Sequence, residues 1–223
     1  MNNDLVTSEP QTQVPTAAPR EPAEKSGSGP STMKITSATI ENFKAIEKTE
    51  VPLSDCTVIV GTNGSGKSSI LQALHWMLQS GRNPSVSPEK DKASTLSELE
   101  ATYMPSPEYK NASHSTEYGN VASAPKMDLV LDATVDGSEE LRVPMWIKSA
   151  RNEGISVHIP SNNQLTSLIR SPQREISAYI PGLAGIPLSE EKRSKRIVHR
   201  QAAAGDANTV LRNILELLKN RSE

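Results

Sequence analysis

A glycine-rich loop is the part of this chain whose residue types and spacing can do chemistry. Lys67 and Ser68 stand in it where the pattern G-x-x-x-x-G-K-[ST] requires them. Glycines let successive backbone N–H groups turn inward and hold an anion. We expect Lys67 to reach the β- and γ-phosphates of a nucleoside triphosphate and Ser68 to ligate Mg²⁺. The predicted site for ATP and Mg²⁺, with Lys67 as its catalytic residue, consists of Gly61, Thr62, Asn63, Gly64, Ser65, Gly66, Lys67, Ser68 and Ser69.

The segments on either side of the loop predict the elements that position it. Cys56–Val60 is short, apolar and β-branched, which predicts a buried parallel strand. Ser69–Gln79 predicts an amphipathic helix, since its apolar residues recur at helical spacing: Ile70, Leu71, Leu74, Met77 and Leu78. A helix that begins near Lys67 would add the positive end of its dipole to the phosphate site. The alternative, a chance match in a turn rich in Gly and Ser, does not explain why strand, loop and helix agree.

Composition narrows the class of protein. The chain has 223 residues, of which 35% are hydrophobic and 3% aromatic, so long polar stretches are expected beside one domain. The net charge of −2 gives no overall basic field, and any contact with DNA would be local. Cys56 is the single cysteine, which excludes an internal disulfide and predicts a buried, inert thiol. Because no apolar run reaches the ~20 residues of a membrane span and no signal peptide is apparent, we expect a cytoplasmic protein.

Changes in pattern divide the chain. Residues 1–32 are rich in Pro, Ser, Thr and Glu and predict a disordered tail; whether Met1 or Met33 is the true start stays open. Residues 33–220 are expected to form the domain, which opens with a half-buried strand over Met33–Ile46. Residues 79–125 form a polar insertion broken by prolines, in which Thr95–Met104 predicts a short helix.

The second half of the domain predicts strands and then helices. Residues 127–160 predict an antiparallel β-meander with turns at Asp136-Gly137 and Glu153-Gly154, and Pro144 places its strand at an edge or a bulge. Ile176–Ile180 predicts one more strand. Residues 189–220 are expected to be helical, over Ser189–Ala204 and again over Asn208–Asn220, with Asp206 as a cap.

Four segments taken together resemble a known group of ATPases. Met33-Lys34-Ile35, Ile40–Ala45 and Val58–Ser69, followed by Leu71–Leu74, resemble the N-terminal part of SMC, RecF, SbcC and OLD-type heads, which are ABC-class, AAA-type ATPases acting on DNA. The residues 178–187 and 205–213 look like bacterial defence-associated members. The resemblance implies an α/β P-loop NTPase fold, here an ABC-type head lobe with an antiparallel β-subdomain and C-terminal helices.

The same resemblance implies parts that this sequence does not display. Such heads hold ATP between two protomers, so it implies a second head, a homodimer, and in some members a nuclease or effector partner. One protomer offers a signature loop, and a Walker B strand ends in Asp-Glu. Met127–Asp132 lacks the Glu, Leu188–Lys192 lacks the signature glycines, and Gln173 or Gln201 is the available glutamine for Mg²⁺. The chain therefore looks like the N-terminal half of a longer ATPase.

Other residues are weaker candidates. Lys44 lies where related heads carry a basic residue near ATP or DNA, and is otherwise a surface lysine. Lys192–Arg200 is the most basic stretch and would contact DNA phosphates, although a solvated helix face is the commoner explanation. The four histidines show no metal-ligand spacing.

These observations leave two functions open. In the first, the chain is the ATP-binding part of an SMC/RecF-like ATPase that couples hydrolysis to DNA engagement in repair or anti-phage defence. In the second, it is a regulatory or interaction module that binds nucleotide without hydrolysing it, which the missing acidic residue favours. A small-molecule kinase is disfavoured, because a polar insertion and a meander follow the loop helix where lid arginines would be expected.

Overall fold

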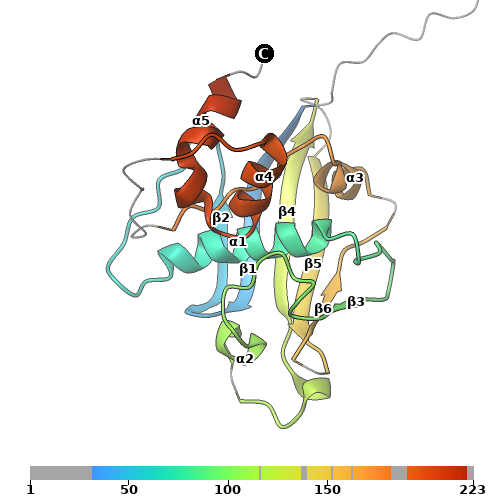
Figure 1. Cartoon of the computed structure of the whole chain (residues 1–223). Coiled ribbons are helices and arrows are strands. Elements are labelled where there is room, and N and C mark those ends of the chain that lie inside the picture. The colour runs from blue at the N-terminus through green and yellow to red at the C-terminus, as the bar shows by residue number, and fades with distance from the viewer. Residues whose placement is uncertain are drawn as a thin grey trace, which may run out of the picture. The chain divides into compact units, whose positions relative to one another are not determined.

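A six-stranded antiparallel sheet is the centre of the fold (Figure 1). The computed structural model describes residues 32–115, 117–136, 140–151, 153–161, 163–181 and 190–219, so the predicted tail lies outside them apart from Thr32. The strands stand in the order β2-β1-β4-β5-β6-β3, and each neighbouring pair is antiparallel. Their bounds are Met33–Phe43 (β1), Ile46–Pro52 (β2), Ser94–Leu96 (β3), Met127–Val135 (β4), Glu140–Ser149 (β5) and Ile155–His158 (β6).

The helix after the glycine loop covers one face of this sheet. It is α1, Lys67–Arg82, and it crosses β1, β4 and β5 in Figure 1. Trp76 and Met77 of α1 are fully buried against apolar strand residues such as Leu129 and Met145. Burying a large apolar side chain contributes roughly 1.5–3 kcal/mol, so this face anchors the helix and, through it, the loop that precedes it. The predicted helix is confirmed and is longer than Ser69–Gln79 at both ends.

The remaining helices are short. They are α2 Tyr109–Ala112, α3 Gln164–Arg170, α4 Lys195–Ala203 and α5 Leu211–Lys219, with single 3₁₀ turns at Val121–Ser123 and Ala207–Val210. The helix expected from Ser189 begins only at Lys195, and residues 182–189 lie outside the described part. The helix expected from Asn208 begins with the 3₁₀ turn, where Asp206 makes no side-chain cap. No helix in the described ranges has the length and apolar character to cross a membrane.

A buried histidine ties α1 to the segments that follow the sheet. The His75 Nε2–H donates to the carbonyl of Ala203, 3.0 Å away, and Nδ1 accepts from the Ser177 hydroxyl at 3.0 Å. This assignment follows from the carbonyl, which can only accept a hydrogen bond. Gln79, one turn further along α1, donates to both the hydroxyl and the carbonyl of Ser177. Polar contacts thus hold the segment around Ser177 and the end of α4 on α1.

The first predicted strand is a hairpin in the structure. The segment Met33–Ile46 was expected to be one strand, but it turns at Lys44 and Ala45 and pairs back as β2. Asn42 and Lys44 have φ values of 57° and 48°, left-handed conformations that polar residues in turns tolerate better than branched ones. Alternating side chains run through both strands, so the pattern predicted the strands and missed the turn between them.

The buried parallel strand predicted over Cys56–Val60 is wrong. No described residue pairs with this segment as a strand, and Val58 and Val60 are 77% and 85% exposed. Cys56 is exposed too, which corrects the expectation of a buried thiol. The physical reason is that a parallel strand is buried between neighbouring strands of its own sheet. The described strands all belong to one antiparallel sheet, and none of them pairs with this segment. The β-branched run has strand character without a strand beside it.

Two further predictions of local structure are also wrong. Residues 94–96 form β3, which pairs with β6, and the rest of the expected helix Thr95–Met104 is turn and loop. Leu96 is fully buried beside β6, so tertiary burial overrides the helical pattern. Ile176–Ile180 has no regular secondary structure and does not join the sheet. The meander strands are present as β4, β5 and β6. Pro144 of β5 pairs with Val130 of β4, but β6 pairs only with Trp146–Ser149, so no described strand pairs with Pro144 on its other side.

Candidate functional site

The glycine loop lies between the β1–β2 turn and the start of α1. It lines a cavity of about 400 Å³ together with Lys44 and Ala45. Gly64 and Gly66 have φ values of 83° and 87°, which L-residues with a side chain rarely adopt. The φ of Gly66, rather than lack of space, is what disfavours a side chain there, because a Cβ would meet Cγ1 of Ile46, the first residue of β2, at an ordinary contact distance of 3.5 Å. These glycines let the backbone curl at the foot of the helix, as the sequence pattern requires.

The N-terminus of α1 offers unpaired backbone donors to the cavity. The first intrahelical bond is from the Ile70 N–H to the Gly66 carbonyl at 3.0 Å, so the N–H groups of the three preceding residues have no helical acceptor. The cap residue is Gly66, which supplies no side-chain acceptor, and the first turn contains no acidic residue. The partial positive charge of the helix end is therefore left uncompensated, and an anion is the group that it favours.

Lys67 is folded over its own loop. Its Nζ donates to the carbonyls of Gly61 at 2.8 Å and Thr62 at 2.6 Å. Carbonyl oxygens carry only a partial negative charge, so phosphate oxygens would be stronger acceptors for the same ammonium group. Ser68, predicted to ligate Mg²⁺, is exposed on the first turn of α1 beside it. All nine predicted loop residues are thus neighbours, and Asn63–Ser69 line the cavity itself.

Lys44 lines the same cavity. Its Nζ donates to Oε1 of Gln72 on α1 at 2.8 Å and to the carbonyl of Pro105 at 3.0 Å. Burial lowers the pKa of this ammonium group from its usual value. The backbone around it is also fixed, because the Lys44 N–H donates to the carbonyl of Ala112 at 2.8 Å. Sequence reasoning placed Lys44 near the site, but it gave no sign of Gln72, which orients the lysine from one turn into the helix.

The other candidates for catalysis have structural partners elsewhere. Asp132, the acid of the possible Walker B strand, accepts from Arg142 at 2.7 Å and from Ser37 at 3.0 Å within the antiparallel sheet. The hydrogen bond from Arg142 holds the pKa of this carboxyl below its usual value. Glu190, in the possible signature segment, accepts from the backbone N–H groups of Arg212 and Asn213 and so caps α5. Neither carboxylate lines the loop cavity.

The two candidate glutamines lie away from the loop. Gln173 is exposed just after α3 and accepts from the hydroxyl of Ser171. Ser171 is held by Arg82, the last residue of α1, so this region lies at the far end of the helix. A 16-residue helix is about 24 Å long. Gln201 lies on α4, with a buried Oε1 atom that has no hydrogen-bond partner in the described structure. Among the described residues, no cluster of His, Cys, Asp and Glu could hold a metal ion.

The match to a known family model includes this site. Residues 33–121, which contain β1, β2, the glycine loop and α1, match the family model described as AAA ATPase domain. The chain is also 46% identical over 46 residues to the uncharacterized protein MJECL44 of Methanocaldococcus jannaschii. That stretch is 20% of this chain, and it covers only 14% of the length of the relative. Over residues 33–121 the chain is therefore similar to AAA-type ATPase domains, a likeness that supports ATP binding at the loop.

Proposed function

We propose that the loop Gly61–Ser69 binds the phosphates of ATP with Mg²⁺. The observation that carries this proposal is the geometry of the cavity: an uncapped N-terminus of α1, two glycines with positive φ and Lys67 lie together in one cavity of about 400 Å³. Each of these features favours a polyphosphate over a neutral ligand. The likeness to AAA ATPase domains covers the same residues. In this proposal Lys67 leaves its two carbonyl acceptors for the β- and γ-phosphates, and Ser68 ligates Mg²⁺.

We infer that the full function is that of an SMC/RecF/OLD-like ATPase head. In that proposal ATP binding and hydrolysis are coupled to engagement of DNA in repair or defence, with a second head and, in some assemblies, a nuclease or effector as partner. The proposal rests on the likeness to AAA ATPase domains and on the run Thr57–Val60 directly ahead of the loop, in which Thr57, Val58 and Val60 are exposed. Exposed β-branched residues beside a nucleotide site suit the addition of a further strand. Such a strand would be the natural carrier of the acid that a hydrolytic site needs.

The second candidate function is nucleotide binding without turnover. It is favoured by one observation: the residues that line the loop cavity include two lysines but neither Asp nor Glu. Hydrolysis of ATP requires a group that positions the attacking water, and Mg²⁺ is usually held by a carboxylate as well. With the described residues alone, the site can bind and orient phosphates. It supplies no base to the water.

Nucleotide titration tests the binding proposal. The purified chain is titrated with a fluorescent ATP analogue in the presence and absence of Mg²⁺, and the measurement is repeated for Lys67→Ala and for Lys110→Ala, an exposed lysine on α2. A charged hydrogen bond contributes about 1.5–3 kcal/mol, so Lys67→Ala should weaken binding by at least about tenfold. Lys110→Ala should bind as the wild type does. Equal affinity of all three proteins would refute the assignment of the site.

Phosphate release separates the two functions. The chain is incubated with ATP and Mg²⁺, with and without duplex DNA, and inorganic phosphate is measured over time. If the chain binds ATP and releases phosphate no faster than Lys67→Ala does, the non-hydrolysing function holds for this chain. Release that depends on Lys67 and rises with DNA would support the ATPase.

A further inference from the structure

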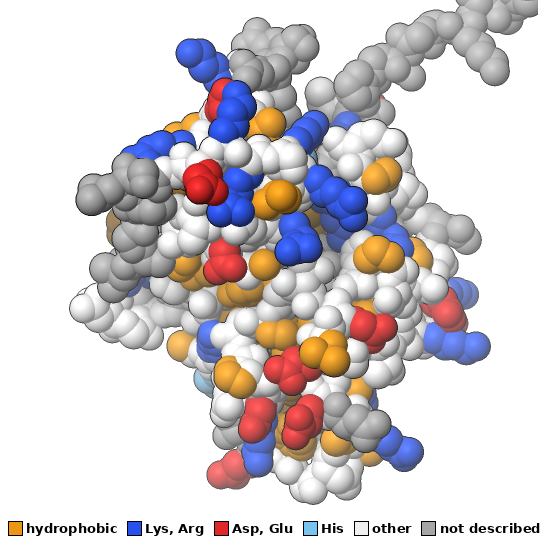
Figure 2. Space-filling model, viewed as in Figure 1, with side chains coloured by type: hydrophobic (Ala, Val, Ile, Leu, Met, Phe, Trp, Pro, Cys, Tyr) orange, Lys and Arg blue, Asp and Glu red, His pale blue; other side chains and the backbone are white. Residues whose placement is uncertain are grey.

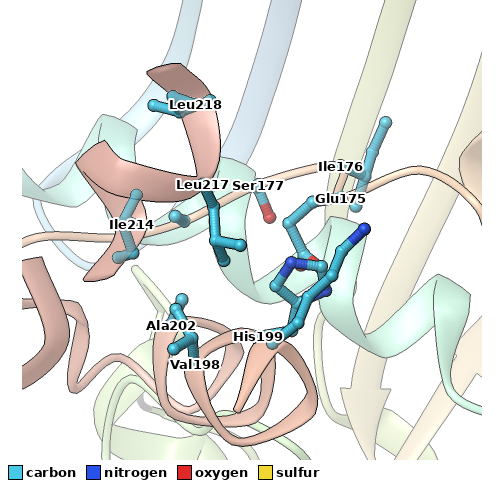
Figure 3. A pocket seen from close by; sticks show the side chains of 11 residues that line it. Glu175, Ile176, Ser177, Val198, His199, Ala202, Ile214, Leu217 and Leu218 are labelled. Carbon is cyan, nitrogen blue, oxygen red and sulfur yellow. The ribbon is translucent and has the colours of Figure 1, made fainter. Parts of the chain in front are cut away.

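A groove separates α5 from α4 and from the extended segment 175–178 (Figure 3). Its volume is about 400 Å³. In Figure 3, Leu217 reaches down from α5 toward Val198 and Ala202 of α4, while Glu175 and His199 lie at one end. The apolar lining consists of Ile176, Val198, Ala202, Ile214, Leu217 and Leu218. The groove is separate from the cavity at the glycine loop, because no residue lines both of them.

Polar contacts hold the first turn of α5 in place. Asn213 is the one α5 residue that is buried, and its side chain donates to Glu190 and to the carbonyl of Glu191. Three apolar residues of α5, Ile214, Leu217 and Leu218, line the groove from one side of the helix, yet Leu218 remains 53% exposed. A helix with such a segregated apolar side normally buries it. Here the described structure leaves that side as one wall of an open groove.

The acidic and basic residues at and beside the groove differ in whether they form ion pairs. Glu175 is engaged by Nδ1 of His199 at 3.1 Å and by Arg82 at 3.7 Å, and Glu216 by Lys192 at 3.1 Å. In contrast, three exposed cations of α4 form no ion pair with any described residue: Lys195, which lines the groove, and Arg196 and Arg200, which lie on the same helix outside its lining. Figure 2 shows Lys and Arg side chains gathered over the part of this face where α3, α4 and α5 lie in Figure 1. The two glutamates thus form ion pairs within the chain, whereas the three cations of α4 can form ion pairs with a partner.

We propose that this groove docks an amphipathic helix of a partner protein, with apolar residues on one side and Asp or Glu along its border. The apolar lining suits side chains spaced i, i+3, i+4 and i+7, the way a helix fills a groove between two helices. The unpaired cations of α4 supply the complementary charge for the acidic border. A nucleic acid would satisfy the cations but would leave the leucine and isoleucine lining without a matching surface. The proposal does not depend on nucleotide binding.

A peptide library provides the test. The chain is screened against displayed helical peptides of about 18 residues, roughly five turns, in which apolar and charged positions are both varied. We expect enriched sequences to carry large apolar residues at the helical spacing and acidic residues beside them. One enriched peptide is then labelled, and its affinity for the full chain is measured by fluorescence anisotropy. A selection that enriches no peptide, or enriches basic ones, overturns the proposal.

Leu215 and Leu218 give a matched pair of variants. Both are leucines of α5, and they are 56% and 53% exposed, but only Leu218 lines the groove. Leu218→Asp should weaken the peptide by at least about tenfold, as loss of an interface anchor does, while Leu215→Asp should not. Both substitutions add the same charge to the same exposed helix, so general unfolding of α5 would affect the two alike. Equal affinity of the two variants, whether both bind or both fail, overturns the assignment to this groove.

The charge requirement is tested separately. Lys195→Glu should weaken the acidic peptide several-fold and reduce the salt dependence of its binding, while Lys110→Glu on α2 should do neither. If Lys195→Glu binds the peptide as the wild type does, the charge argument is wrong. If a DNA duplex displaces the peptide and its own binding is lost in Leu218→Asp, the surface belongs to nucleic acid and the proposal fails.

Discussion

Gly154 is a position where one added methyl group should have a measurable effect. It is buried in the turn between β5 and β6, and an alanine Cβ there would lie 2.5 Å from the carbonyl oxygen of Leu96. Backbone atoms cannot rotate away as a side-chain end can, so β3 has to shift. Leu96 is fully buried and pairs with Ile155, which means that a shift also disturbs the end of the sheet.

The size of the effect follows from two limits. Overpacking that forces a backbone shift costs about 1–3 kcal/mol. If β3 instead detaches, Leu96 becomes exposed, which costs roughly 1.5–3 kcal/mol. Both routes give a similar loss. Replacing Gly by Ala also stabilises by about 0.4–1 kcal/mol through the unfolded chain, so Gly154→Ala alone understates the clash.

Gly119→Ala removes that ambiguity. Gly119 is exposed, it has no atom within 4 Å of an added Cβ, and its φ is not in the left-handed region. Both variants gain the same unfolded-state term, so their difference isolates the clash. For a domain of this size 1 kcal/mol shifts Tm by about 2–4 °C, so thermal unfolding followed by circular dichroism should place Gly154→Ala about 2–12 °C below Gly119→Ala. Coincident transitions would show that Gly154 does not pack against β3 as described.

Three other predictions concern titration, exposure and the loop cavity. Burial lowers the pKa of His75 below its ordinary value of 6.5, so the unfolded state binds more protons than the folded state as the pH falls below 6.5. The contribution of His75 to the free energy of unfolding should therefore be complete above pH 6.5 and decrease below it, and urea unfolding should show a smaller decrease between pH 7.5 and 5.5 for His75→Asn than for the wild type. Cys56 is exposed, so a maleimide should label the native chain nearly as fast as the chain in urea, and strong protection would contradict the structure. Lys44→Gln removes a charge from the loop cavity, so ATP titration should show weakening by up to about tenfold, less than for Lys67→Ala; no change would separate Lys44 from the nucleotide.

Local patterns determined several elements of this protein. The glycine loop and the helix after it are readable because phosphate-loop spacing and helical periodicity both act over a few residues, and α1 follows them. The strands of the meander are readable for the same reason, since alternation over Met127–Val135 and its neighbours reflects which face is buried. The loop cavity likewise consists largely of residues adjacent in sequence.

Tertiary structure decided what no local pattern contains. Cys56–Val60 has the composition of a buried strand, but a strand requires a neighbour, and no described strand pairs with it. Leu96 belongs to β3 because β6 is there to pair with it, although its segment has helical spacing. Gln72 meets Lys44 only because the β1–β2 turn folds against α1. The groove beside α5 also arises from segments distant in sequence, since burial, pairing and charge partners depend on which segments the fold brings together.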